Sequence, residues 1–159
     1  MNPLKYFKIS QHEITSNIVT IPDILESELT AARGLVRQID DPKDKEYLNF
    51  YENPYPIISH RFKNAIRPCL PEALGIPMSL ANRFINLVVI FWILEMELVE
   101  NQGIDENAGL IIKHDDIADR KLFKTKTGLR DHVIADFDII ELLLRNSITD
   151  IGFTEISVI

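Results

Sequence analysis

The segment Phe84–Val99, FINLVVIFWILEMELV, constrains the fold most, because apolar residues run through it almost unbroken. Its periodicity fits both a helix and a strand. Within it, Val88–Ile93 is a run of β-branched and aromatic residues, which lose side-chain freedom in a helix and pack well in a sheet. We therefore expect a central strand, buried on both faces up to Leu94 and half exposed where Glu95 and Glu97 place one face in water.

This segment is predicted to be protein core and not a membrane span. A transmembrane helix needs roughly 18 or more apolar residues, and Asn86 and Glu95 bracket only eight. The amino-terminal residues MNPLKYFKIS lack the apolar core of a signal peptide, and Cys69 is the single cysteine, so no internal disulfide can form. These features predict a cytoplasmic protein.

The composition is that of one globular domain. The chain has 159 residues, of which 46% are apolar and 26% are charged. Its formal net charge is −7, which argues against general binding to nucleic acids or to anionic membranes, because both require a basic surface.

Two strand–cap–helix units are predicted. Ser59 follows an apolar pair and precedes HRFKNAI, in which Phe62, Ala65 and Ile66 would share one helical face, so Ser59 is a natural N-cap. Asp136 occupies the same place before FDIIELLLRN. We expect the first helix to end before Pro68, since proline cannot continue it.

The amino-terminal part is less regular. Lys5–Ser10 and Asn17–Ile21 suit a hairpin or a loose pair of strands. Residues 24–36 have apolar residues near helical spacing, and this helix could either end near Gly34 or run through it.

Together these patterns predict a single α+β domain over residues 1–159, with a mixed, mainly antiparallel sheet and two or three short helices. The helices after Ser59 and Asp136 are expected to pack against the Phe84–Val99 strand. Gly128 predicts a turn, so the last 39 residues read strand, turn, strand, helix, strand.

The second half of the chain contains four landmarks: Pro56–Lys63 (PIISHRFK), Leu122-Phe123, Val133–Leu144 and Ile148–Phe153 (ITDIGF). In this order they resemble immunity protein family eleven, a bacterial family formerly known as a domain of unknown function. The resemblance covers residues 55–159 and is weak over residues 1–54. It implies an immunity protein of a polymorphic-toxin system, which binds a cognate toxin domain and blocks it without catalysis.

An acidic segment offers a partner-binding surface for such a role. Against the single base Lys113 it places eight acids, which are Glu95, Glu97, Glu100, Asp105, Glu106, Asp115, Asp116 and Asp119. On one surface they would attract a basic partner, such as a nuclease toxin. The alternative is a solvated loop that keeps the protein soluble. The bases that follow are expected to pair with neighbouring acids or to line the polar face of a sheet; they are Arg120, Lys121, Lys124, Lys126 and Arg130.

A metal-dependent or nucleophilic enzyme is the weaker hypothesis. Candidate metal ligands are His114, Asp115, Asp116 and Asp119, and candidate acid, base or nucleophile residues are His60, His132 and Cys69. No His-x-x-x-His pair, second cysteine, glycine-rich phosphate loop or Gly-x-Ser-x-Gly motif accompanies them. We therefore expect no catalytic residue, metal or cofactor, with Cys69 a small core residue.

A third hypothesis is a non-enzymatic scaffold or interaction module, which could be a homodimer. Two predicted strand ends could offer edges for pairing; they are the segment with Leu94, Met96, Leu98 and Val99, and the terminal Val158-Ile159. Genomic position would separate this hypothesis from an immunity protein, whose gene should lie beside that of a large toxin.

Overall fold

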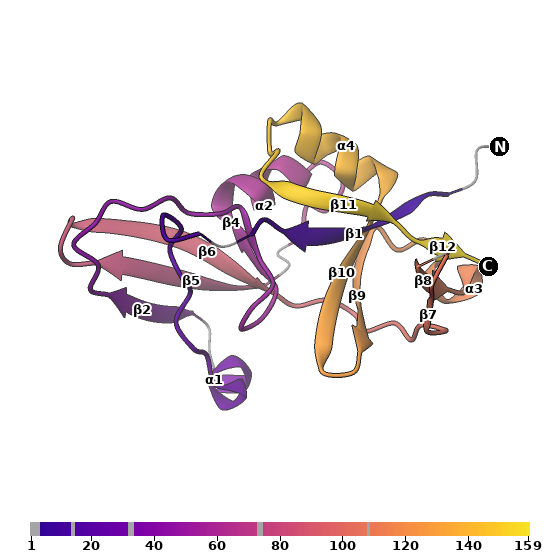
Figure 1. The fold of residues 1–159 in the computed structure, drawn as a ribbon, viewed down its shortest axis with the longest axis horizontal. Coiled ribbons are helices and arrows are strands. Elements are labelled where there is room, and N and C mark those ends of the chain that lie inside the picture. Colours follow the sequence, from indigo (N-terminus) through magenta and orange to yellow (C-terminus); the bar gives the residue numbers. More distant parts are fainter. Residues whose placement is uncertain (1–3, 14, 32–33, 73–74, 108) are drawn as a thin grey trace.

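Strand β6 (Leu87–Leu94) lies in the middle of a five-stranded sheet with the strand order β2-β5-β6-β4-β3 (Figure 1). This computed structural model describes residues 4–13, 15–31, 34–72, 75–107 and 109–159. The remaining strands of the sheet are β2 (Leu35–Ile39), β3 (Phe50–Tyr51), β4 (Ile57–Ser59) and β5 (Gly75–Asn82). β6 is antiparallel to β4 and β5, whereas β2 is parallel to β5. The predicted central strand is confirmed.

The bounds and exposure predicted for this strand are wrong. Residues 84–86 belong to a turn, in which Asn86 has a φ of 50°, and the strand ends at Leu94 instead of Val99. It also begins exposed and ends buried, since Val88 is 63% exposed and Phe91 is fully buried. The apolar run could not reveal this order, because it depends on which distant elements cover each face.

A four-stranded antiparallel sheet, ordered β11-β1-β10-β9, joins the two ends of the chain. Its strands are β1 (Tyr6–Gln11), β9 (Leu122–Thr127), β10 (Arg130–Asp136) and β11 (Ile151–Glu155). β1 lies between β10 and β11, so the hairpin predicted for Lys5–Ser10 and Asn17–Ile21 is wrong. Ile18 instead forms an isolated bridge with Glu46. The predicted turn at Gly128 is confirmed, with a φ of 61°.

A small third sheet, ordered β12-β8-β7, lies near the carboxyl terminus. It contains β7 (Ile104–Asp105), β8 (Gly109–Ile112) and β12 (Ser157–Val158), and β8 is followed by α3 (His114–Ile117). The buried Tyr6 hydroxyl donates to the Ile117 carbonyl at 3.2 Å and to the Arg120 carbonyl at 3.1 Å. These bonds fasten the α3 region to β1.

Two helices begin at the predicted caps. Ser59 Oγ accepts from the Phe62 N–H at 3.0 Å and starts α2 (His60–Ile66). Asp136 Oδ1 accepts from the Ile139 N–H at 3.0 Å and starts α4 (Phe137–Arg145). Both strand–cap–helix units are therefore confirmed, and α2 ends before Pro68 as expected.

The apolar pattern of residues 24–36 resolves into two elements. Helix α1 spans Glu26–Ala31, and β2 begins at Leu35. The predicted helix is thus shorter than its apolar pattern, whose carboxyl end is a strand. Residues 32 and 33 lie outside the described residues.

Three apolar clusters form the core. The first joins α2 and α4 to the five- and four-stranded sheets and includes Phe62, Ile139 and Leu94. The second, which includes Met78 and Phe91, covers one face of the β5–β6 pair. The third surrounds Tyr6 and α3. α2 contacts β6, but α4 packs chiefly on α2 and β10, which corrects the expectation that both helices pack on β6.

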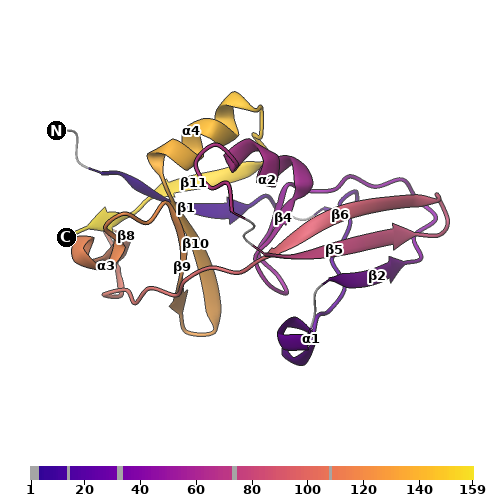
Figure 2. The ribbon, with the colours of Figure 1, turned by 180° about the vertical axis from the view of Figure 1, so that it is seen from behind.

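The predicted α+β class and single domain with mainly antiparallel strands are confirmed. In the described parts of the chain the strands divide among three sheets, and there are four helices instead of two or three. Figures 1 and 2 show that the β5–β6 pair extends at one end of the molecule, while α3 and β7 lie at the opposite end. No helix within these residues is long and apolar enough to cross a membrane.

Candidate functional site

The first half of β6 has an open edge. β4 pairs only with Phe91, Trp92 and Ile93 of β6, because at Ser59 the chain leaves the strand and starts α2. On the other side β5 pairs along the whole of β6. Among the described residues, Leu87–Ile90 therefore have no strand neighbour on the β4 side. The cap that starts α2 is what leaves this edge unpaired.

The backbone groups of Val88 and Ile90 point out from the open edge. The Leu94 N–H donates to the Pro56 carbonyl on the β4 side at 2.9 Å. In an antiparallel sheet the N–H and C=O groups of alternate residues face the same neighbour. By this alternation, those of Val88 and Ile90 face away from β5. The Val88 N–H, the Val88 C=O and the Ile90 N–H are available to a further strand, whereas the Ile90 C=O faces His60, the residue after Ser59 in the β4–β6 register.

The same two residues present apolar side chains to solvent. Val88 is 63% exposed and Ile90 45%, and Val36 of β2, which lies on the same face of the sheet, is 66% exposed. We call these three residues the uncovered β6 face. Trp92 follows Ile90 on this face, and there the first apolar cluster covers the sheet. Exposed apolar side chains that gather in this way are typical of an interaction site.

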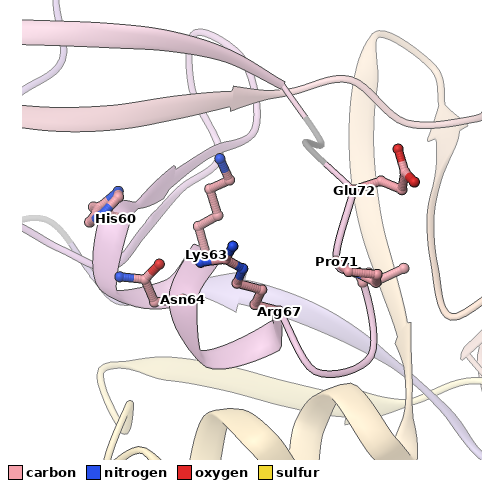
Figure 3. Close-up of a pocket in the computed structure, with 7 residues that line it drawn as sticks. His60, Lys63, Asn64, Arg67, Pro71 and Glu72 are labelled. Carbon is pink, nitrogen blue, oxygen red and sulfur yellow. The ribbon is translucent and has the colours of Figure 1, made fainter.

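A polar groove of about 400 Å³ begins where this face meets α2. Its walls are His60, Lys63, Asn64, Arg67, Leu70, Pro71 and Glu72, and we call it the α2 groove (Figure 3). Lys63 extends from α2 so that its Nζ lies 3.1 Å from the centre of the Trp92 ring. Trp92 Nε1 also donates to His60 Nδ1 at 3.2 Å. The indole thus connects the groove to the uncovered β6 face.

The α2 groove carries positive charge without a matching carboxylate contact. In the described part of the chain, no acidic oxygen lies within ion-pair distance of Lys63 or Arg67, although Glu72 lines the same groove. Partial burial lowers the pKa of Lys63, and the charge of Arg67 lowers it further.

The predicted acidic residues are all exposed at the surface. Glu97 is paired with Arg120, whose Nε lies 2.9 Å from Glu97 Oε2, and this contact lowers the pKa of Glu97. Glu95, Glu100, Glu106, Asp115, Asp116 and Asp119 have no lysine or arginine nitrogen within 4 Å of their carboxylates in the described ranges, although Arg120 donates to the backbone carbonyl of Asp116. The segment therefore keeps most of its negative charge uncompensated.

Most of the bases after the acidic segment pair elsewhere. Lys121 Nζ lies 2.9 Å from Asp138 and 3.3 Å from Asp136, and the hydrogen bond to Asp138 raises its pKa. Lys124 and Lys126 each lie 3.8 Å from Asp131. The prediction that these bases pair with acids is thus confirmed for four of the five, but only Arg120 pairs with the acidic segment among the described residues.

The candidate enzymatic residues do not converge. His114 Nδ1 lies 3.8 Å from Asp115, but no three His, Cys, Asp or Glu side chains in the described residues are placed to hold a metal ion together. Cys69 is half-buried against the first apolar cluster, and burial raises the pKa of its thiol. His132 is half-buried too, and desolvation lowers its pKa. Neither Cys69 nor His132 belongs to a metal-binding cluster with the candidate ligands around His114 in the described residues.

The predicted pairing edges are partly wrong. Leu94 and Val99 are buried, and a backbone bridge joins Leu98 to Lys124 of β9. β12 is an edge strand, as expected for the terminal Val158-Ile159. The open edge of β6 and the α2 groove were not predicted. A local signal existed for the edge, since Ser59 ends β4 after three residues.

No family model matches this chain, and no curated protein matches it significantly.

Proposed function

We propose that this protein is an immunity-type protein that binds a cognate bacterial toxin domain and neutralises it, without catalysing a reaction. The observation that supports this role is the acidic segment, whose eight carboxylates are exposed and mostly without an ion-pair partner among the described residues. Uncompensated like charges create a long-range field. Such a field accelerates the capture of a basic partner, and a toxin that cuts nucleic acid needs a basic surface to bind phosphates.

The arrangement of α3 supports a defined surface and not a loose loop. Ile117 is buried in the third apolar cluster, and the Tyr6 hydroxyl holds the carbonyls of Ile117 and Arg120. Asp115, Asp116 and Asp119 are therefore displayed from an anchored turn. A fixed array of charges orients a partner, whereas a mobile one mainly improves solubility.

The test is co-purification with the product of the adjacent gene, followed by stopped-flow association. Neutralising Asp115→Asn, Asp116→Asn and Asp119→Asn together should slow association about tenfold at low salt and less at high salt. The matched control removes three charges elsewhere, with Glu13→Gln, Glu26→Gln and Asp44→Asn. An unchanged association rate would show that the acidic segment does not contribute to capture of the toxin. The absence of any toxin partner would contradict the proposal itself.

The second candidate is a non-enzymatic interaction module that forms a homodimer. The observation that favours it is the open edge of β6, since two copies could pair there. Light scattering of the purified protein at micromolar concentration measures this directly. A monomeric mass that does not change with concentration would exclude it.

A further inference from the structure

We propose that the open edge of β6 binds an extended segment of a partner protein as an additional strand, and that acidic side chains of this segment occupy the α2 groove. The open edge of β6 lies toward the opposite end of the molecule from α3, and α2 lies between them (Figures 1 and 2). The edge is therefore separate from the part of the acidic segment around α3, and the inference goes beyond the role proposed above. It predicts a partner segment of opposite charge to the one that the acidic surface would attract.

The backbone of β6 provides the first half of the site. Val88 directs its N–H and C=O away from β5 and Ile90 directs its N–H, which gives three groups for a further ladder, because the Ile90 C=O faces His60, the residue after Ser59 in the register. An extended peptide that adds to a sheet edge obtains its affinity from these main-chain bonds. The open stretch ends at Phe91, where Ser59 of β4 takes over the pairing.

The uncovered β6 face provides apolar contacts for alternate side chains of the added strand. Directly opposite residues in neighbouring strands have their Cβ atoms about 5 Å apart. A β-branched residue of the partner would therefore contact Val88 or Ile90 and reduce their exposure to water. The alternate residues of the partner would point to the opposite face.

The α2 groove selects the charge of the segment. Moving along β6 toward its carboxyl end, the partner meets α2 at the point where β4 ends. Lys63, Arg67 and His60 line the groove there, and the described residues provide no carboxylate in ion-pair contact with Lys63 or Arg67. A carboxylate placed here would gain charge-assisted hydrogen bonds. An acidic segment is thus favoured over a neutral or basic one.

A second copy of the chain fits this site less well. In an antiparallel β6–β6 pair, each copy could align only Leu87–Ile90, because Ser59 already occupies the edge opposite Phe91. The α2 groove of each copy would then approach the hairpin turn of the other, where Asp40 is already paired with Arg83. That turn offers no unpaired carboxylate from this pair, so the basic groove would stay uncompensated.

The experiment uses Trp92, the single tryptophan of the chain, as a fluorescent reporter. The probes are two acetylated and amidated hexapeptides, Thr-Val-Thr-Val-Asp-Glu and the reverse-order Glu-Asp-Val-Thr-Val-Thr, so that both strand directions are tested. The control peptides carry Lys-Lys in place of the acidic pair. We expect a saturable change in Trp92 emission with one acidic peptide and at least about tenfold weaker binding of its lysine control.

Two sets of changes then separate charge from strand addition. The double variant Lys63→Glu and Arg67→Glu should weaken the acidic peptide about tenfold or more and improve the binding of the lysine control. In the peptide, N-methylation of alternate residues removes donors without altering the protein. Methylation of the set that faces β6 should abolish binding, and methylation of the other set should leave it largely intact.

The outcomes are decisive in both directions. Absence of saturable binding by either acidic peptide overturns the proposal, as does an equal effect of the two methylation patterns. Equal affinity for the acidic and lysine peptides removes the role of the α2 groove. A dimeric mass by light scattering that reverts to monomer with Ile90→Pro would assign the edge to a second copy. None of these results depends on the toxin, so they leave the proposed function to its own test.

Discussion

Lys63 Nζ lies 3.1 Å from the centre of the Trp92 ring, which makes this pair the direct link between α2 and the exposed half of β6. The same indole donates to His60, so a single side chain organises two residues of the α2 groove. The ammonium group lies over the face of the ring and shields it from water. The pair therefore influences both the stability of the helix–sheet contact and the solvent access of Trp92.

Removing this lysine side chain should uncover the tryptophan. Lys63→Ala is expected to increase acrylamide quenching of Trp92 and to lower the free energy of unfolding by about 0.5–1 kcal/mol, the range of an exposed cation–π contact. Lys63→Met should keep most of the shielding, because its stem is similar. Asn64→Ala on the same side of α2 is the control. Equal quenching in Lys63→Ala and the native protein would contradict this prediction.

Gly75 in β5 should not tolerate a side chain, because a Cβ at this position would collide with the backbone of β6. A Cβ on Gly75 would lie 2.0 Å from the Ile93 carbonyl oxygen and 2.9 Å from its carbon, both of them backbone atoms of β6. Gly75→Ala should lower the free energy of unfolding by at least about 2 kcal/mol, because the strand pair must separate. In Gly152→Ala the nearest atom, Ser10 Cβ, lies at 3.5 Å. That control should change stability by less than about 1 kcal/mol, measured by urea denaturation.

The features that could be predicted from sequence are the ones set by neighbouring residues. The caps at Ser59 and Asp136 depend on an oxygen and an N–H three residues apart, and the β-branched content of β6 determines that it is a strand. Exposure of the acidic segment follows from its composition. Local chemistry was sufficient in each case.

The features that were missed depend on contacts between distant residues. β1 lies between β10 and β11, which no local pattern indicates. Similarly, the exposure of Val88 depends on the early end of β4 and on which face the second apolar cluster covers. The α2 groove is lined by residues close together in sequence, and the part that depends on distant residues is its contact with Trp92, which the β4–β6 pairing places beside Lys63.

Tyr51 should titrate late and stabilise the fold through its hydroxyl. Burial raises its pKa to about 12, and its hydroxyl donates to the Val19 carbonyl at 2.9 Å while accepting from the Leu48 N–H at 3.0 Å. Tyr51→Phe leaves both buried backbone groups unpaired and should cost about 1–3 kcal/mol. Tyr55→Phe is the matched control.

The loss of stability at alkaline pH follows from the raised pKa of Tyr51. A phenol whose pKa is raised by folding contributes stability that is complete below its ordinary pKa of about 10 and is lost as the pH rises toward 12. The native protein should therefore lose more stability than Tyr51→Phe between pH 10 and pH 12. Guanidinium denaturation with absorbance at 295 nm measures both. Parallel pH profiles of the two proteins would contradict the assignment.

His132 should make the protein sensitive to mild acid. Desolvation lowers its pKa, with Lys8 and Arg130 acting in the same direction and Glu52 and Asp131 opposing them. The neutral ring lies with Nε2 2.5 Å from Thr127 Oγ1. Since the unfolded chain takes up the proton more readily, the contribution of His132 is complete above its ordinary pKa of about 6.5 and declines as the pH falls below it.

Replacing this histidine should therefore reduce the slope of stability against pH between about pH 7.5 and 5.5, a window that stays above the ordinary pKa of the carboxylates. His132→Gln retains a hydrogen-bonding group for Thr127 but cannot gain a proton, so acidification should cost it less stability than it costs the native protein. His12→Gln, at an exposed position, is the control. Urea denaturation at several pH values measures the three slopes. A His132→Gln profile parallel to that of the native protein would show that His132 is not the group that responds to acid in this window.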